Sequence, residues 1–288
     1  MAHLRPHHRV DLPRSDARPG VGLTASTGSR VAVAGGHLVL DDSGSGEPAI
    51  VLLHGFTFDR SSWDPQFDRF AAHHRTLRYD LRGFGSSGPP VAGRGHVDDL
   101  LDLLDERGVG RAHLVGLSLG ANLALAAALR HPDRVAGIVL ASPGLPGHRW
   151  TTPRPPDEVA EHARAFGVEA GRRFWLDHEI FASTVDYPEA RAGLERMVAA
   201  FAGLQWADGP QTDPLPALHE RLGEVAAPTL VVHGARDVAG YRGIARVIAA
   251  GVPGARRHEL STAGHLVNLE QPDEFNTAVL GFLASVRG

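Results

Sequence analysis

The chain has 288 residues, with 29 basic and 33 acidic side chains, no cysteine and a formal charge of −4. The absence of cysteine excludes disulfide frameworks, thiolate metal sites and cysteine nucleophiles. The near balance of charges, with arginine interspersed among acidic residues, argues against a nucleic-acid-binding protein. The hydrophobic content of 43% and the length favour one globular α/β core with a sizeable insertion.

The apolar residues are distributed in short stretches. No stretch approaches the ~18 uninterrupted apolar residues that a membrane helix needs. The start of the chain is rich in Arg, His, Pro and Asp and lacks the apolar segment of a secretory signal. We therefore expect a cytoplasmic protein that does not bind a membrane, with residues 1–28 as a flexible leader.

Residues 29–142 and 228–288 carry alternating β-prone and amphipathic segments. A Gly-Gly pair separates the first two β-prone segments, which predicts a hairpin. Ser61 or Ser62 is expected to cap the first helix. The predicted strands are residues 30–33, 37–40, 49–53, 75–79, 112–115, 135–140, 229–232 and 257–260, and the later core helices are residues 97–106, 119–129, 243–250 and 272–286. This alternation predicts an α/β core, in which a largely parallel sheet has helices on both faces.

Residues 143–227 interrupt the alternation. Their first part is rich in proline. The remainder predicts short amphipathic helices around residues 159–166, 170–181 and 188–201. We interpret the segment as an inserted helical cap. Trp150, Trp175 and Trp206 lie in it, and such large side chains either line a ligand pocket or attach the cap to the core. For any single one we favour attachment.

Residues 116–120, Gly-Leu-Ser-Leu-Gly, match the GxSxG pattern and lie between a predicted strand and a predicted helix. Glycine on each side permits a sharp, strained turn that presents Ser118 above the sheet at the N-terminus of the helix. A backbone N–H group and the positive helix end can stabilise an oxyanion there. In the alternative interpretation, Ser118 only caps the helix and the glycines serve packing.

A serine nucleophile needs a base within hydrogen-bonding reach, and the base needs a group that orients it. His265 follows the last predicted strand and Asp237 follows the strand before it, so both lie at the carboxyl ends of strands, where ligands bind in parallel sheets. Asp237 could instead cap a helix, and His265 could be a surface loop residue. Their joint occurrence in the order Ser, Asp, His favours a triad of Ser118, His265 and Asp237.

The second oxyanion donor is expected in the loop after the strand at residues 49–53. We assign the backbone N–H groups of Phe56 and Leu119 as the two donors. His54 and His233 each precede a glycine at the end of a strand. We interpret both as buried side chains that brace their loops by hydrogen bonds.

Several motifs together resemble the α/β-hydrolase fold superfamily. They are residues 54–56 (HGF), 79–87 (YDLRGFGSS), the GxSxG segment, 233–237 (HGARD), and 264–265 (GH) with 268–272 (NLEQP). The resemblance covers about residues 38–282 and implies an eight-stranded sheet whose second strand is antiparallel, a serine hydrolase triad and a cap that shapes the pocket. Within the superfamily the sequence is most similar to the bacterial esterases, enol-lactone hydrolases and cofactor-free haloperoxidases. Asp80, Arg82, Gly83 and Ser86 match a family motif that is generally structural.

Serine at the centre of the motif argues against the epoxide hydrolases and haloalkane dehalogenases of this fold, which use aspartate there. We expect hydrolysis of a small or medium hydrophobic carboxylic ester or lactone through an acyl-enzyme, with no metal or cofactor. The pocket is expected to have an apolar floor. Its predicted residues are Trp63, Trp150, Trp175, Val238 and Leu266.

Other functions stay open at this point. Carbon–carbon bond hydrolases of ring-fission products use the same three residue types, but their serine commonly lies between Asn and Met, where this chain has Leu117 and Leu119. A cofactor-free perhydrolase or haloperoxidase, or a non-catalytic small-ligand receptor, would keep the same constellation. We expect a small-molecule ester or lactone as the partner, and neither nucleic acid nor membrane. The sequence leaves the oligomeric state open.

Overall fold

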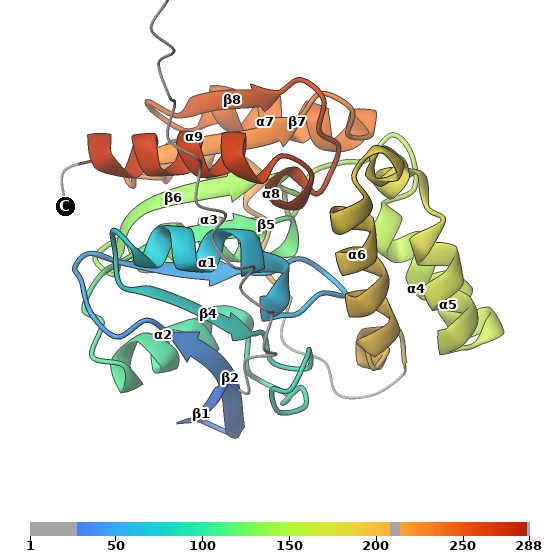
Figure 1. The fold of residues 1–288 in the computed structure, drawn as a ribbon, viewed down its shortest axis with the longest axis horizontal. Coiled ribbons are helices and arrows are strands. Elements are labelled where there is room, and N and C mark those ends of the chain that lie inside the picture. Colours follow the sequence, from blue (N-terminus) through green and yellow to red (C-terminus); the bar gives the residue numbers. More distant parts are fainter. Residues whose placement is uncertain (1–27, 208–213, 287–288) are drawn as a thin grey trace, which may run out of the picture.

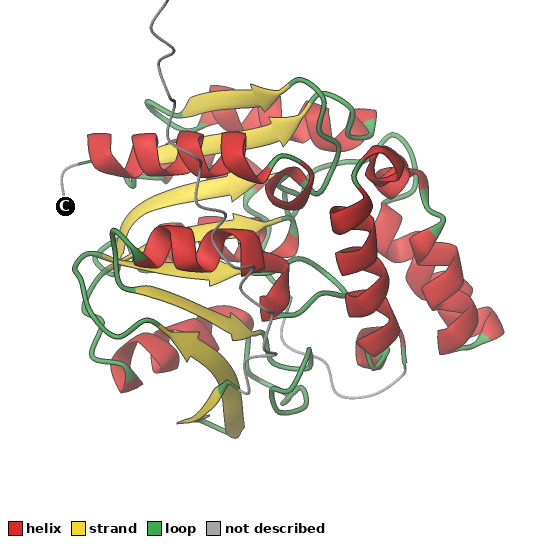
Figure 2. Ribbon diagram, viewed as in Figure 1, coloured by secondary structure: helices red, strands yellow, loops and turns green. Residues whose placement is uncertain are grey.

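Eight strands form a single sheet in the order β1-β2-β4-β3-β5-β6-β7-β8 (Figure 1, Figure 2). The structure, a computed structural model, describes residues 28–207 and 214–286, so the predicted leader lies outside the described residues except for Gly28. β2 pairs antiparallel with β1 and β4, and the other pairs are parallel. The strands are β1 (Ser29–Val33), β2 (Gly36–Asp42), β3 (Ala49–Leu53), β4 (Thr76–Asp80), β5 (Ala112–Leu117), β6 (Val135–Ala141), β7 (Thr229–Gly234) and β8 (Arg256–Leu260). The mostly parallel sheet with an antiparallel second strand is therefore confirmed.

The central strands are apolar, and helices cover both faces of the sheet. β3, β5 and β6 are buried at every residue, as expected for strands packed on both sides. α1 and α9 pack against each other in front of the sheet, and α3 packs behind it on β5 and β6 (Figure 1). The core helices are α1 (Asp64–Ala71), α2 (His96–Glu106), α3 (Leu119–Arg130), α7 (Ala239–Gly251), α8 (Val267–Glu270) and α9 (Pro272–Ser285). Because the parallel strands all point the same way, the loops after them gather at one edge of the sheet.

The first helix begins differently from the sequence prediction, because neither Ser61 nor Ser62 caps it. The carboxylate of Asp59 accepts a hydrogen bond of 2.8 Å from the N–H of Ser61 and opens a 3-10 turn, η1 (Arg60–Trp63), which leads into α1. A carboxylate is as good a cap as a hydroxyl and also carries the favourable charge at a helix N-terminus. The predicted cap was therefore wrong by two or three positions.

The segment between β6 and β7 folds into helices that lie beside the carboxyl ends of the parallel strands (Figure 1). They are α4 (Pro155–Phe166), α5 (Val168–Leu176), η2 (Glu179–Asp186), α6 (Pro188–Ala200), η3 (Leu204–Trp206) and η4 (His219–Glu224). The single helix predicted at residues 170–181 is two helices, because Nδ1 of His178 accepts a hydrogen bond of 3.1 Å from the N–H of Ile180 and begins η2. Among the helices that the structure describes, none is long and apolar enough to cross a membrane.

His113 on β5 is expected to make the fold sensitive to acid. It is 1% exposed, and within the described residues neither ring nitrogen has a hydrogen-bond partner. Burial, together with the nearby charges of His74 and Arg111, lowers the pKa of His113 from 6.5 to about 4. Between these two pH values the unfolded chain binds more protons than the folded chain, so stability falls as the pH falls through this window.

We expect His113→Leu to remove this proton uptake. Between pH 7 and pH 5, the free energy of unfolding in urea should drop by about 1–2 kcal/mol less in the variant than in the wild type. His73→Leu, at an exposed position, is the matched control and should leave the drop unchanged. An equal drop in the wild type and in His113→Leu would contradict the lowered pKa.

Candidate active site

Ser118 occupies a strained turn between β5 and α3. Its backbone has φ of +53° and ψ of −105°, a conformation that residues other than glycine rarely adopt. Two glycines make the turn possible, because a Cβ on Gly116 would overlap the backbone of Gly120, and a Cβ on Gly120 would overlap the carbonyl group of Leu53. The GxSxG segment therefore forms the sharp strand-to-helix turn that its pattern predicts, with Ser118 at the N-terminus of α3.

Asp237 and His265 lie side by side in the loops after β7 and β8. Nδ1 of His265 is 2.8 Å from Oδ2 of Asp237, and both side chains are almost fully buried. The two loops are joined through their backbones. The N–H of Arg236 donates to the carbonyl oxygen of Ala263 at 2.9 Å, and a Cβ on Gly234 would overlap that same carbonyl. The structure thus brings together the aspartate and the histidine that the sequence pairs.

Glu270 braces the loop that carries His265. Its carboxylate oxygens accept hydrogen bonds from the N–H groups of Gly264 at 2.6 Å and Leu266 at 3.1 Å, the residues on either side of the histidine. Burial raises the pKa of Glu270, and these two backbone hydrogen bonds oppose the rise. Sequence analysis assigned no role to Glu270, although it lies in one of the family motifs, because the bend of the loop around its carboxylate is visible only in the folded chain.

His54 braces the loop after β3. The N–H of Leu81 donates to its Nε2 at 2.9 Å, and its Nδ1 lies 2.8 Å from the carbonyl oxygen of Gly55. Burial lowers the pKa of His54, which keeps the ring neutral. His233 is likewise fully buried, and its Nε2 lies 3.3 Å from Nη1 of Arg257 on β8. The bracing role predicted for His54 is confirmed, and for His233 the predicted burial is confirmed.

Trp175 connects the inserted segment to the loop that contains Phe56. Its indole N–H donates to Oγ1 of Thr57 at 2.8 Å, and the hydroxyl of Thr57, a residue with φ of +65°, donates to the carbonyl oxygen of Phe56 at 2.6 Å. The ring of Phe56 also meets those of Trp175, Phe201 and Trp206, with centroids 5.9–6.5 Å apart. The attachment role that we favoured for the tryptophans therefore holds for Trp175 and Trp206.

The family motif after β4 is structural, as the resemblance implies. Asp80 accepts hydrogen bonds from the N–H groups of Arg60 at 2.8 Å and Ser86 at 2.9 Å and pairs with the Arg60 guanidinium at 2.7 Å. Arg82 makes two parallel hydrogen bonds to Asp99, at 2.7 and 2.8 Å, and both side chains are buried. These contacts hold the β4 end in place.

A cavity of about 640 Å³ opens beside Ser118. Its aromatic lining comprises Phe56, Phe84, Trp150 and Tyr241, and its polar lining includes His148, Arg154, Asp157, Arg164 and Gln205. A smaller recess is lined by both Ser118 and His265, together with Trp175 and aromatic neighbours. The charged side chains come from α4 and its N-terminal end, so the lining is more polar than the apolar floor expected from the sequence.

Two of the five residues predicted for the pocket border these spaces, Trp150 the cavity and Trp175 the recess. Trp63, Val238 and Leu266 border neither, so for these three the prediction was wrong. Trp63 is fully buried with its ring against α9, and Leu266 is fully buried too. A residue that is close in sequence to an active-site loop can still point its side chain away from the pocket. Large apolar side chains such as these are commonly buried in the core.

Tyr241 is a residue of the site that sequence analysis missed. It lies in the first turn of α7, four residues after Asp237, and borders both the cavity and the recess. Burial raises the pKa of Tyr241, and the nearby hydroxyl of Ser118 opposes the rise. The Ser, Asp and His pattern does not include a tyrosine. Only the spacing of four residues from Asp237 could have indicated that Tyr241 lies in the site.

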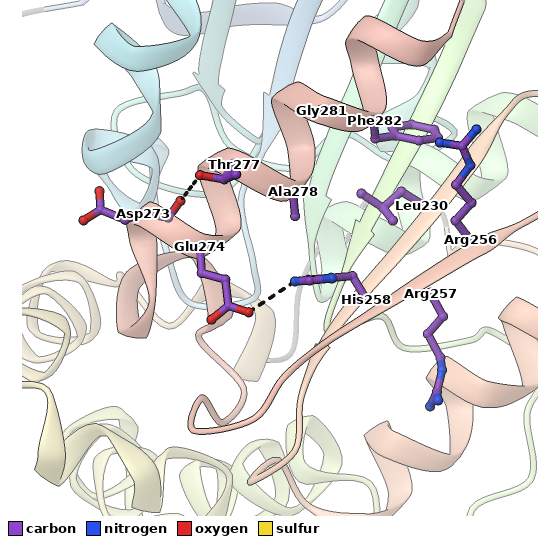
Figure 3. A pocket seen from close by; sticks show the side chains of 10 residues that line it. All are labelled: Leu230, Arg256, Arg257, His258, Asp273, Glu274, Thr277, Ala278, Gly281 and Phe282. Carbon is purple, nitrogen blue, oxygen red and sulfur yellow. Dashed lines mark hydrogen bonds and ion pairs between the residues drawn. The ribbon is translucent and has the colours of Figure 1, made fainter.

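A second hollow, of about 550 Å³, lies between β8 and α9 (Figure 3). There Nε2 of His258 is 3.3 Å from Oε1 of Glu274, and the hydroxyl of Thr277 donates to the carbonyl oxygen of Asp273 at 2.8 Å. It shares no lining residue with the cavity beside Ser118.

In the part of the chain that the structure describes, no group of three or more His, Cys, Asp or Glu is arranged to hold a metal ion. The candidate active site is therefore the one around Ser118.

Comparison with known proteins agrees with this geometry. The profile of the alpha/beta hydrolase family matches residues 50–278. The chain belongs to the alpha/beta hydrolase family.

Among its relatives, two that are 30% identical to it have different names. One, from Bacillus subtilis (strain 168), is provisionally named 2-succinyl-6-hydroxy-2,4-cyclohexadiene-1-carboxylate synthase and aligns over 92% of this chain and 99% of its own. The other, a 2-hydroxy-6-oxononadienedioate/2-hydroxy-6-oxononatrienedioate hydrolase of Cupriavidus pinatubonensis, aligns over 85% and 90%.

Among solved structures, the enol-lactonase of Burkholderia xenovorans LB400 has a TM-score of 0.77 to this hydrolase and 28% sequence identity, over 89% of this chain and 100% of the enol-lactonase. The family and the fold are thereby established, and the chain is a hydrolase. The names of its relatives differ in the substrates that they give, so similarity leaves the substrate of this hydrolase open.

The close approach at Gly120 should make this position intolerant of any side chain. We expect Gly120→Ala to lower the free energy of unfolding by about 3 kcal/mol or more, because the new Cβ would overlap the backbone of Leu53 in the central sheet. Gly281→Ala in α9 is the matched control. No atom lies within 4 Å of its added Cβ, and the change should stabilise the helix by about 0.5–1 kcal/mol. Urea unfolding measures both, and a Gly120→Ala protein as stable as the wild type would contradict the described turn.

Proposed function

We propose that this hydrolase cleaves a small or medium hydrophobic carboxylic ester or lactone through a serine-bound acyl intermediate. The observation that carries the proposal is the pairing of Nδ1 of His265 with Oδ2 of Asp237 at 2.8 Å, in a recess that Ser118 also lines. A free serine hydroxyl is a poor nucleophile, and a histidine oriented by a carboxylate is the arrangement that activates it.

The reaction proceeds in two halves. Oγ of Ser118 attacks the carbonyl carbon while Nε2 of His265 takes the serine proton, and Asp237 holds the imidazole and stabilises its charged form. The tetrahedral intermediate then expels the alcohol oxygen, which takes the proton from Nε2. A water molecule, deprotonated by the same histidine, attacks the acylated serine and releases the acid. With a lactone, the acid and the alcohol stay in one molecule.

The backbone N–H groups of Phe56 and Leu119 are proposed to bind the oxyanion. Leu119 is the first residue of α3, so its N–H has no intrahelical acceptor and lies at the positive end of the helix dipole. Phe56 lies in the loop that Thr57 and Trp175 hold by hydrogen bonds. One such donor typically accelerates turnover by roughly 10²–10³-fold.

The cavity supports a substrate of modest size with an apolar part. Its volume of about 640 Å³ is in the range of small-molecule sites, and aromatic rings including those of Phe56 and Trp150 line it. An enol-lactone is a cyclic ester, so the structural similarity to an enol-lactonase supports the same bond type here.

A carbon–carbon bond hydrolase is the second candidate. The name of the relative from Cupriavidus pinatubonensis gives a hydroxy-oxo dicarboxylate as its substrate, and the polar lining on the α4 side of the cavity would suit a polar substrate. Leu117 and Leu119 beside the serine favour the ester hydrolase instead. We expect kcat/KM for phenyl esters and lactones to exceed that for 2-hydroxy-6-oxodienoic acids, and the reverse order would favour the second candidate.

We expect a fluorophosphonate to add once to the wild type and not to Ser118→Ala, because only an oriented histidine makes the serine reactive. Intact-protein mass spectrometry measures the adduct. Ester turnover should fall by about 10⁴-fold or more in Ser118→Ala. A folded wild-type protein that takes up no label would indicate a small-ligand receptor, and a Ser118→Ala protein that keeps most of the activity would remove Ser118 from the mechanism.

We expect Glu270→Gln to slow fluorophosphonate labelling and ester turnover by about 10- to 100-fold with the fold retained. An amide offers one acceptor oxygen, so the N–H of Gly264 or of Leu266 loses its partner and His265 is held less accurately. Glu274→Gln, at the half-exposed partner of His258 between β8 and α9, is the matched control and should leave both rates unchanged. Equal rates in Glu270→Gln and the wild type would contradict the positioning role.

A further inference from the structure

Tyr241 contacts the proposed nucleophile but has no part in the mechanism above. It is 3% exposed and lies in the first turn of α7, so its position follows from the same loop that carries Asp237. Its side chain borders the cavity and the recess together with that of Ser118, and the serine hydroxyl is near enough to influence the pKa of Tyr241. A buried hydroxyl beside the proposed nucleophile is more than packing requires, since phenylalanine would fill the same space.

The ring of Tyr241 lies against the imidazole of His265. Its centroid is 4.4 Å from that of the His265 ring and 5.1 Å from that of Trp150. The tyrosine therefore lies on the imidazole side of the site. In acyl transfer the imidazole gives its proton to the departing oxygen, so the departing oxygen passes on this same side.

The phenol is suited to be a hydrogen-bond donor. Burial and the negative charge of Asp237 raise the pKa of Tyr241 above its usual range, so the hydroxyl is protonated at neutral pH. It cannot compete with His265 as the base. It can donate one hydrogen bond to whichever nearby oxygen carries the most negative charge.

We propose that Tyr241 is a further catalytic residue, whose hydroxyl donates to Oγ of Ser118 before acylation and to the departing oxygen as the carbon–oxygen bond breaks. The proposal rests on the proposed ester hydrolase function. As the bond breaks, its electron pair goes to the departing oxygen, that oxygen takes its proton from Nε2 of His265, and Tyr241 keeps its own proton. When Oγ of Ser118 becomes part of an ester, it loses basicity. The hydroxyl of Tyr241 then donates its hydrogen bond to the departing oxygen, which carries more negative charge.

The consequence is a dependence on the leaving group. An alkoxide carries much more charge than a nitrophenoxide as it departs, so a donor to this oxygen matters most for poor leaving groups. We expect Tyr241→Phe to lower kcat/KM by no more than about threefold for p-nitrophenyl esters and by about 30- to 100-fold for alkyl esters of the same acid, in line with the loss of one hydrogen bond to a developing charge. The phenylalanine ring keeps the contacts with His265 and Trp150.

The experiment compares kcat/KM across p-nitrophenyl, phenyl, trifluoroethyl and ethyl esters of one acyl group that the wild type hydrolyses. Tyr79→Phe is the matched control, since it removes the buried hydroxyl of a tyrosine that borders neither the cavity nor the recess. Tyr79→Phe should give the same ratio of variant to wild-type kcat/KM for all four esters. Thermal unfolding of both variants separates loss of fold from loss of rate.

A ratio of variant to wild-type rates that falls steadily from p-nitrophenyl to ethyl ester supports the role of Tyr241. A ratio that is the same for all four esters overturns it and leaves the tyrosine as packing. Fluorophosphonate labelling of the wild type, run alongside, distinguishes this failure from that of the proposed function. A labelled, active wild type with a constant ratio rejects only the role of Tyr241, whereas an unlabelled, inactive wild type rejects both.

Discussion

Ser118 has a φ of +53°, a strained backbone conformation that persists only where the surrounding structure enforces it. Here the ends of β3 and β5 and the first turn of α3 enforce it. A residue in such a conformation costs about 1–3 kcal/mol. The fully buried strands β3, β5 and β6 offset that cost by the burial of their apolar side chains from water. Gly116 and Gly120 allow the backbones to meet closely enough for the turn, so two positions without side chains determine where the proposed nucleophile lies.

The partners of Ser118 come from chain segments more than a hundred residues away, and backbone contacts between loops position them. The loops after β7 and β8 meet at Gly234, which places Asp237 beside His265, and Glu270 supports the histidine loop from within. The inserted helices attach to the loop after β3 through Trp175. The core loops therefore position the residues of the proposed chemistry, and side chains of the insertion border both the cavity and the recess beside them.

Local patterns in the sequence were sufficient for the strands, most helices, the turn at Ser118 and the pairing of Asp237 with His265, because each depends on hydrophobic period or on a motif at a strand end. Trp63 was placed in the pocket although the core holds it, since a linear pattern does not show which way a side chain points. Tyr241 was missed because the site residue that it lies beside, Ser118, is far away in the chain. Glu270 was missed because only the folded loop brings its carboxylate to the N–H groups of Gly264 and Leu266. Asp59 caps the first turn in place of the expected serine, because residues 59–62 contain more than one good capping residue.

The central claim is that Ser118 is a nucleophile served by a histidine on one side and by oxyanion donors on the other. A crystal structure of the protein with a phenylboronic acid tests it most directly, because the tetrahedral adduct of boron with a serine resembles the tetrahedral intermediate. We expect a covalent bond from Oγ of Ser118 to boron, with one boronate oxygen about 2.7–3.1 Å from the N–H groups of Phe56 and Leu119 and another facing His265 and Tyr241. Electron density for the acid elsewhere in the cavity, with Oγ unmodified, would contradict it.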